Sequence, residues 1–166
     1  MNSFAILLLG LMMVGQAAPA GRVDTTFDKK ANFAALKTYS WASGRNAFLP
    51  EAHRMIIAAC DTEMAALGFK KVDSGADVTI SYYSTTLTQV DLKELDKIEN
   101  ADKSAPGPTK ELGKLVVVMR SAKAREQLWT AATNEFLNSD RAKLADTIQT
   151  VTARLFATYP TRTDRK

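Results

Sequence analysis

The sequence predicts an α+β domain in which a mainly antiparallel sheet of about five strands packs against two helices. Several short segments alternate apolar and polar residues, as half-buried strands do. Two longer segments repeat apolar residues at helical spacing. The predicted order is β-β-α-β-β-β-α, and because strands mostly follow strands, an antiparallel sheet is favoured over a parallel α/β fold.

Residues 1–20 are predicted to be a secretory signal peptide that is cleaved from the mature protein. The uncharged apolar run Ala5–Val14 is shorter than the roughly 20 residues that span a bilayer. Small residues at Ala18 and Ala20 form a typical cleavage site, so the mature chain is expected to begin at Gly21. We therefore expect a periplasmic or secreted protein with no transmembrane segment after signal removal.

The first half of the mature chain is predicted to hold two strands and a helix. Residues Arg22–Asp28 and Lys37–Ser43 both alternate in the manner of strands. Pro50 suits the first turn of a helix that runs to about Leu67, and Gly68 then occupies the position that a helix C-cap prefers.

One face of this helix is apolar and the opposite face is polar. Glu51, Arg54 and Asp61 are expected on the solvent side. The apolar stripe consists of His53, Ile56, Ile57, Cys60, Met64 and Leu67.

The second half begins with a strand at residues 77–88 and then changes in character. Residues 91–114 carry eleven charges in 24 positions, which predicts a flexible, solvated excursion whose part from Asp96 to Pro108 is mobile. Leu115–Met119 is apolar at every position, as a central strand is.

A further strand is predicted at residues 127–136. Ser139 is expected to cap the last helix, which runs to Tyr159. The single domain therefore spans residues 21–160, and a polar tail, 161–166, follows it. The apolar stripe of the last helix consists of Leu144, Ile148, Val151 and Leu155.

The composition argues against several functional classes. The net charge is +4, but Lys and Arg are scattered among Asp and Glu, so no nucleic-acid partner is expected. His53 and Cys60, the only histidine and cysteine, lie two helical turns apart, too far for a nucleophilic pair and too few for a zinc site. We expect no catalytic residue, no metal site and no cofactor.

Aromatic residues two apart, Tyr39 and Trp41, share one strand face. They could form a stacking platform for a ligand together with Tyr82. Large aromatic residues more often fill cores, and the predicted helices need a partner layer, so the pattern favours a core strand.

An apolar patch is predicted on the side of the sheet that the helices leave uncovered. Tyr83 and Leu87 would contribute to it, together with either Val116 and Val118 or the alternate set Leu115, Val117 and Met119. Two alternatives stay open, because the N-terminal segment or the charged excursion could instead cover this face.

Short sequence marks in a fixed order resemble a bacterial envelope family, often of lipoproteins, that is grouped as domain-of-unknown-function family 4136. The resemblance implies an envelope compartment and this fold, and it implies no reaction. Two departures are that Gly21, not a lipidated cysteine, follows the signal, and that Arg120–Ser121 replaces an aspartate turn. The marks are Val23–Asp28, Phe33, Lys37–Trp41, Leu67–Phe69, Ala76–Val78, Gly113–Val118, Leu128–Trp129 and Phe156–Pro160.

Together these features predict an exported, non-catalytic envelope protein that acts as a binding or assembly component. Its partner would be another envelope protein or a second copy of the chain. The alternative is a carrier or sensor that holds a small apolar ligand in a pocket between the sheet and the helices.

Overall fold

A computed structural model describes residues 22–91, 94, 107–136 and 141–161. The elements are β1 (Val23–Phe27), a short 3-10 turn η1 (Phe33–Ala35), β2 (Thr38–Trp41), α1 (Pro50–Ala66), β3 (Lys70–Lys71), β4 (Val78–Val90), β5 (Thr109–Ser121), β6 (Gln127–Phe136) and α3 (Arg141–Phe156). The expected signal peptide, residues 1–20, with Gly21, and the expected cap Ser139 lie outside the described residues.

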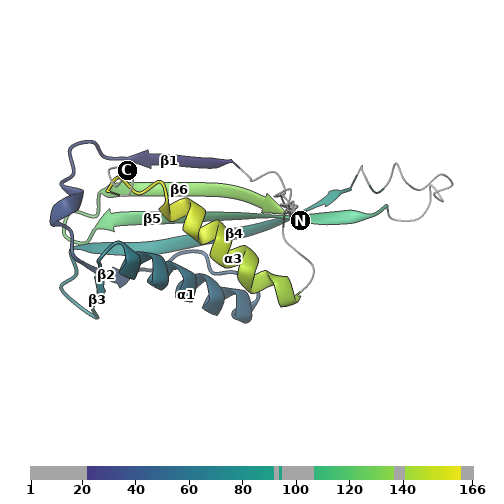
Figure 1. Ribbon diagram of the computed structural model, residues 1–166, viewed down its shortest axis with the longest axis horizontal. Coiled ribbons are helices and arrows are strands. Elements are labelled where there is room, and N and C mark those ends of the chain that lie inside the picture. The colour runs from purple at the N-terminus through teal and green to yellow at the C-terminus, as the bar shows by residue number, and fades with distance from the viewer. Residues whose placement is uncertain (1–21, 92–93, 95–106, 137–140, 162–166) are drawn as a thin grey trace, which may run out of the picture.

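The predicted fold class is confirmed, and the sheet has six strands in the order β1-β6-β5-β4-β2-β3. Both helices pack on one side of it (Figure 1). β1, β6, β5 and β4 pair antiparallel, whereas β2 runs parallel to both of its neighbours. The parallel pairs arise because α1 carries the chain back along the sheet before β3 and β4 begin.

Two details differ from the sequence prediction. The strand β3 was not predicted, because a two-residue strand is too short to show alternation. The excursion expected at 91–114 is shorter than expected, because Thr109–Lys114 belongs to β5 and pairs with Thr85–Val90. This end of the β4–β5 hairpin extends past the helices (Figure 1), so its sequence lacks the one-sided apolar pattern of a covered strand. Most of the segment expected to be mobile, Asp96–Pro108, lies outside the described residues.

The predicted bounds of α1 agree with the structure to within one residue. Pro50 occupies its first turn, and Gly68 follows its end with a φ of +87°, a backbone conformation that favours glycine. Its stripe residues Ile56, Cys60 and Met64 are buried against the sheet. The predicted stripe of α3 is likewise buried at Ile148, Val151 and Leu155, with Leu144 packed beside them.

The side chains of β4, β5 and β6 that point toward the helices alternate with those that point away. The register across these strands joins Ile80, Met119 and Trp129 in one row, all with no exposed surface, on the helix side. The next row toward the other end joins Tyr82, Val117 and Ala131, also buried. Within the described part of the chain, neither helix combines the length and hydrophobicity that a bilayer span needs.

Candidate functional site

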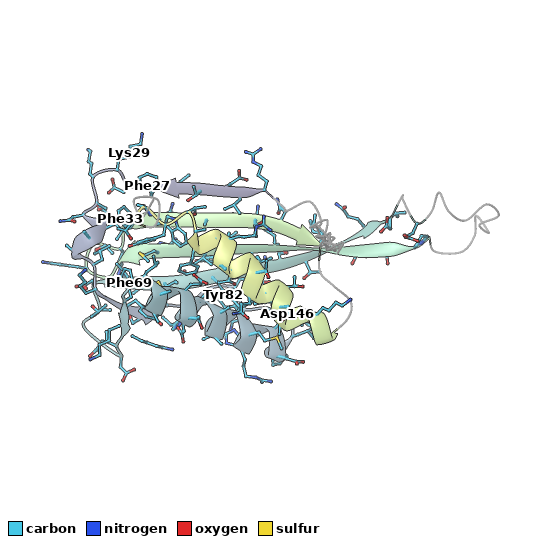
Figure 2. All side chains as sticks on the ribbon, in the orientation of Figure 1. Phe27, Lys29, Phe33, Phe69, Tyr82 and Asp146 are labelled. Carbon is cyan, nitrogen blue, oxygen red and sulfur yellow. The ribbon has the colours of Figure 1, made fainter. Side chains whose placement is uncertain are left out.

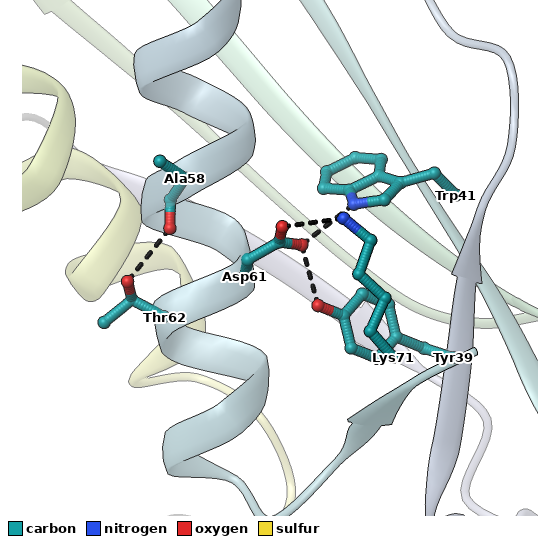
Figure 3. Close-up of polar contacts among 6 residues, drawn as sticks. All are labelled: Tyr39, Trp41, Ala58, Asp61, Thr62 and Lys71. Atoms are coloured by element: carbon teal, nitrogen blue, oxygen red, sulfur yellow. Dashed lines mark hydrogen bonds and ion pairs between the residues drawn. The ribbon is translucent and has the colours of Figure 1, made fainter. Parts of the chain in front are cut away.

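The aromatic pair on β2 is bound to one carboxylate of α1 (Figure 3). The Tyr39 hydroxyl donates to Asp61 Oδ1 over 2.7 Å, and Trp41 Nε1 donates to the same oxygen over 2.9 Å. Lys71 Nζ lies 2.9 Å from Asp61 Oδ2. The expectation that Asp61 faces solvent is therefore wrong: it lies on the flank of the helix that β2 and β3 cover.

The environment of Asp61 keeps its carboxylate ionised. Burial alone would raise the pKa of Asp61, but the hydrogen bonds from Tyr39, Lys71 and Trp41, and the charge of Lys71, outweigh it and lower the pKa. Burial, followed by the bond to Asp61, raises the pKa of Tyr39. This arrangement attaches β2 and the edge strand β3 to α1 and holds no reactive group.

Tyr82 fixes the loop that precedes α1. Its hydroxyl accepts from the Ala47 backbone N–H over 3.0 Å and lies 2.5 Å from His53 Nδ1. Gly44 lies so close to β4 that an added Cβ would be 2.0 Å from the Tyr82 carbonyl oxygen. Only glycine therefore allows the loop to approach the strand here.

The structure places Tyr39, Trp41 and Tyr82 in the core layer. Tyr39 and Tyr82 are each 2% exposed, and the rings of Trp41 and Tyr82 meet edge to face at 6.4 Å. A flat ligand would find no open face of Tyr39 or Tyr82 on which to stack.

His53 and Cys60 do not form a reactive pair. His53 contacts Tyr82, and Cys60 has no exposed surface. Burial, followed by the nearby charges of Asp61 and Glu63, raises the pKa of the Cys60 thiol, which disfavours a reactive thiolate. No group of three or more potential metal ligands occurs among the residues that the structure describes.

The uncovered side of the sheet carries Tyr83, Leu87, Val116 and Val118. The register pairs Tyr83 with Val116, so this set, and not Leu115, Val117 and Met119, points away from the helices. Tyr83 is 37% and Leu87 56% exposed, Val116 is half-buried, and Val118 is only 5% exposed. We call Tyr83, Leu87 and Val116 the outer patch.

A cleft of about 800 Å³ opens on the other side, between the sheet and the N-terminal parts of both helices. It lies beyond the buried row of Tyr82, so none of the three predicted ligand-binding aromatics lines it. Its apolar walls are formed by Leu49, Ala52, Ile56, Leu144, Ile148 and Val151.

The sequence did contain a signal for this cleft. Of the strand positions that face it, Ser84, Thr86, Gly113 and Thr133 carry small side chains, whereas Leu115 carries a large one. In the sequence these small residues interrupt the row of apolar side chains that the covered face of a strand normally carries. Their alignment on three neighbouring strands becomes visible only when the register is known.

The fold is thus a one-layer sheet backed by two helices, without a described catalytic cluster. By sequence the chain belongs to the family described as "Domain of unknown function (DUF4136)", which it matches over residues 23–161. No curated protein matches it.

Solved structures share the fold at low sequence identity. A PDZ domain protein from Parabacteroides distasonis aligns with a TM-score of 0.57 and 15% identity over 83% of this chain. The chain spans 35% of that protein. Two structures of the PelC dodecamer from Paraburkholderia phytofirmans, one of them a variant, align with a TM-score of 0.54 over 82% of this chain. Their identities are 12% and 11%, with 95% and 96% of the PelC chain covered.

Proposed function

We propose that this chain is an exported, non-catalytic component of the bacterial envelope that assembles with further copies of itself through the outer patch. The observation that carries the proposal is the one-sided sheet: both helices cover the same face, and the outer patch lies on the other. Exposed apolar side chains that gather on one surface usually mark an interaction site.

Two further observations support self-assembly. The register places the members of the outer patch on one face: Tyr83 lies opposite Val116, and two rows along Leu87 lies opposite Leu112, with Thr85 and Lys114 in the row between. PelC, which shares the fold over nearly its whole length, is a dodecamer. A fold of this kind can therefore form a homo-oligomer, in which the same surfaces recur in each copy.

The proposal includes the compartment. An envelope location follows from the expected cleavage of residues 1–20, and mass spectrometry of the exported protein should find Gly21 at its N-terminus without a lipid-sized mass increment. A different N-terminus or an attached lipid would contradict this part of the proposal.

A matched pair of variants tests the assembly. Tyr83→Lys places a charge within the outer patch, whereas Thr88→Lys places the same charge on the same strand at an exposed position of the other face. Light scattering should show that Tyr83→Lys dissociates the oligomer and that Thr88→Lys does not. Both changes should alter the free energy of unfolding by less than about 0.5 kcal/mol, as surface substitutions do. A wild-type protein that is monomeric at every concentration would refute the proposal.

A further inference from the structure

We infer that one end of the sheet, where β1 and β5 finish and β2, β4 and β6 begin, docks on a lipid bilayer that carries anionic head groups. We call this end the basic end, and it comprises residues 28–37, 70–77 and 121–126. The inference takes the envelope location from the proposed function and does not depend on self-assembly. The outer patch lies on a face of the sheet, so a contact at the basic end leaves that patch accessible.

The strand register brings three loops together at the basic end. Phe27 ends β1 beside Trp129, near the start of β6. Ser121 ends β5 beside Val78, the first residue of β4. β2 begins next to β3 and β4 at this same end. The connections β1–β2, β3–β4 and β5–β6 therefore all leave the sheet on one side of the molecule (Figure 1).

The three segments carry most of the positive excess of the chain. They contain seven Lys and Arg residues against four Asp and Glu residues, whereas the whole chain has a net charge of +4. One of the seven, Lys71, is paired with Asp61. The other six are exposed, and none forms an ion pair with a described residue: Lys29, Lys30, Lys37, Lys70, Lys123 and Arg125.

Two of the four acidic side chains bind the backbone of the loops. Asp77 Oδ2 accepts from the N–H groups of Lys37 and Thr38, each over 2.9 Å, and from the Thr38 hydroxyl. Asp28 Oδ1 accepts from the Lys30 N–H over 2.8 Å. These carboxylates hold the loops in shape, whereas the six cationic side chains have no such structural role among the described contacts.

Arg125 occupies a position that does not favour arginine. Its φ is +61°, in the left-handed region where glycine and asparagine are the usual residues. The turn uses only its backbone, because the Arg125 N–H donates to the Ser121 carbonyl over 2.8 Å. Among the described residues its guanidinium has no hydrogen-bond or ion-pair partner. Backbone strain at a residue that the fold does not require points to a role in binding.

An exposed aromatic ring lies beside the cations. Phe27 is 45% exposed and contacts Phe33 edge to face at 6.2 Å between ring centroids. Figure 2 shows Phe27, Lys29 and Phe33 together at this end of the molecule. Cations next to an exposed apolar side chain suit a membrane surface, because both electrostatic attraction and buried apolar area contribute to binding there.

A bilayer fits the basic end better than a small anion does. Lys29 and Lys30 follow one edge strand, β1, and Lys70 lies in the other edge strand, β3. Strands lie about 4.8 Å apart, so the cations span the roughly 25 Å width of six strands. Neither of the two described cavities is lined by any of the six cations. Lipid head groups present phosphates over such a width, and each Lys or Arg close to them strengthens binding about fivefold.

The test is sedimentation of the purified exported protein with phospholipid vesicles. The protein should bind vesicles of phosphatidylcholine mixed with about 30% phosphatidylglycerol and should not bind phosphatidylcholine alone. Binding should weaken more than about tenfold as the salt concentration rises from about 0.05 to 0.5 M, because salt screens exposed charges. Inorganic phosphate at matched ionic strength should not compete, which distinguishes a lipid surface from a site for free phosphate.

Substitutions at the basic end locate the contact. Lys29→Gln combined with Lys30→Gln should weaken binding about 25-fold, and Arg125→Asn should weaken it about fivefold. Arg125→Asn should leave the melting temperature unchanged or raise it, because asparagine tolerates a positive φ, so its weaker binding would not reflect unfolding. The matched control is Arg54→Gln, which removes an exposed cation from α1 outside the basic end and should bind as the wild type does.

Absence of binding to the anionic vesicles, equal binding to neutral vesicles, or wild-type affinity after the change of Lys29 and Lys30 would each overturn the inference. A protein that self-assembles but does not bind vesicles would contradict this inference alone. A protein that binds vesicles but stays monomeric would support it and contradict only the proposed assembly.

Discussion

Removal of the Asp61 carboxylate should lower stability by about 3 kcal/mol, more than the loss of a surface charge would. A hydrogen bond to a charged acceptor contributes about 1.5–3 kcal/mol when it is buried. The hydrogen bond from Tyr39 should make this full contribution to stability because Tyr39 is 2% exposed. Trp41 is half-buried, so its hydrogen bond should contribute less. The ion pair with Lys71 joins side chains that are 51% and 29% exposed, so it adds only about 0.2–1 kcal/mol.

The assay is urea denaturation of the wild-type protein and of Asp61→Ala, with Asp61→Asn as the matched control. The asparagine variant keeps an acceptor for Tyr39 and Trp41 and should cost only about 1 kcal/mol. A double-mutant cycle with Tyr39→Phe should give a coupling energy of about 1–2 kcal/mol. If Asp61→Ala costs less than about 0.5 kcal/mol, or if the coupling is zero, β2 is not attached to α1 through this carboxylate.

Three further predictions concern the same region. Because the pKa of Asp61 is lower in the folded chain than its unfolded value of about 3.9, its stabilisation is complete above that value and is lost as the pH falls through the folded pKa. The difference in unfolding free energy between wild type and Asp61→Asn should therefore shrink from pH 6 to about pH 3; a constant difference would contradict this. Gly44→Ala should destabilise the protein by about 2 kcal/mol or more, because its Cβ would collide with the Tyr82 carbonyl oxygen. Thermal melts measure this loss, and the control Ser43→Ala should leave the stability unchanged. The buried Cys60 should react with a thiol reagent only after unfolding, and rapid labelling of the native protein would show that α1 opens.

The sequence allowed a close prediction of the elements whose limits depend on local chemistry. Pro50 and Gly68 bound α1, and the strand at 127–136 was predicted with the limits that the structure has. These signals act through backbone geometry and the alternation of side chains, which neighbouring residues in the sequence determine.

The features that the sequence did not reveal depend on contacts between distant segments. Asp61 lies beside Cys60 on the flank of α1, and the helix sequence alone cannot show that β2 reaches this flank. The register decides that Val116 lies with Tyr83 rather than with Tyr82. The cleft likewise requires the alignment of Thr86 and Gly113 across two strands, which no single segment displays.

The central claim, self-assembly through the outer patch, is tested most directly in cells that export the protein. A photo-crosslinking amino acid is placed at Leu87, within the outer patch, or at Thr88, the next residue, which points to the other face. We predict that illumination traps a product of two copies of this chain from Leu87 and not from Thr88. Crosslinks of equal yield at both positions, no crosslink at Leu87, or capture of only a different protein would contradict the claim.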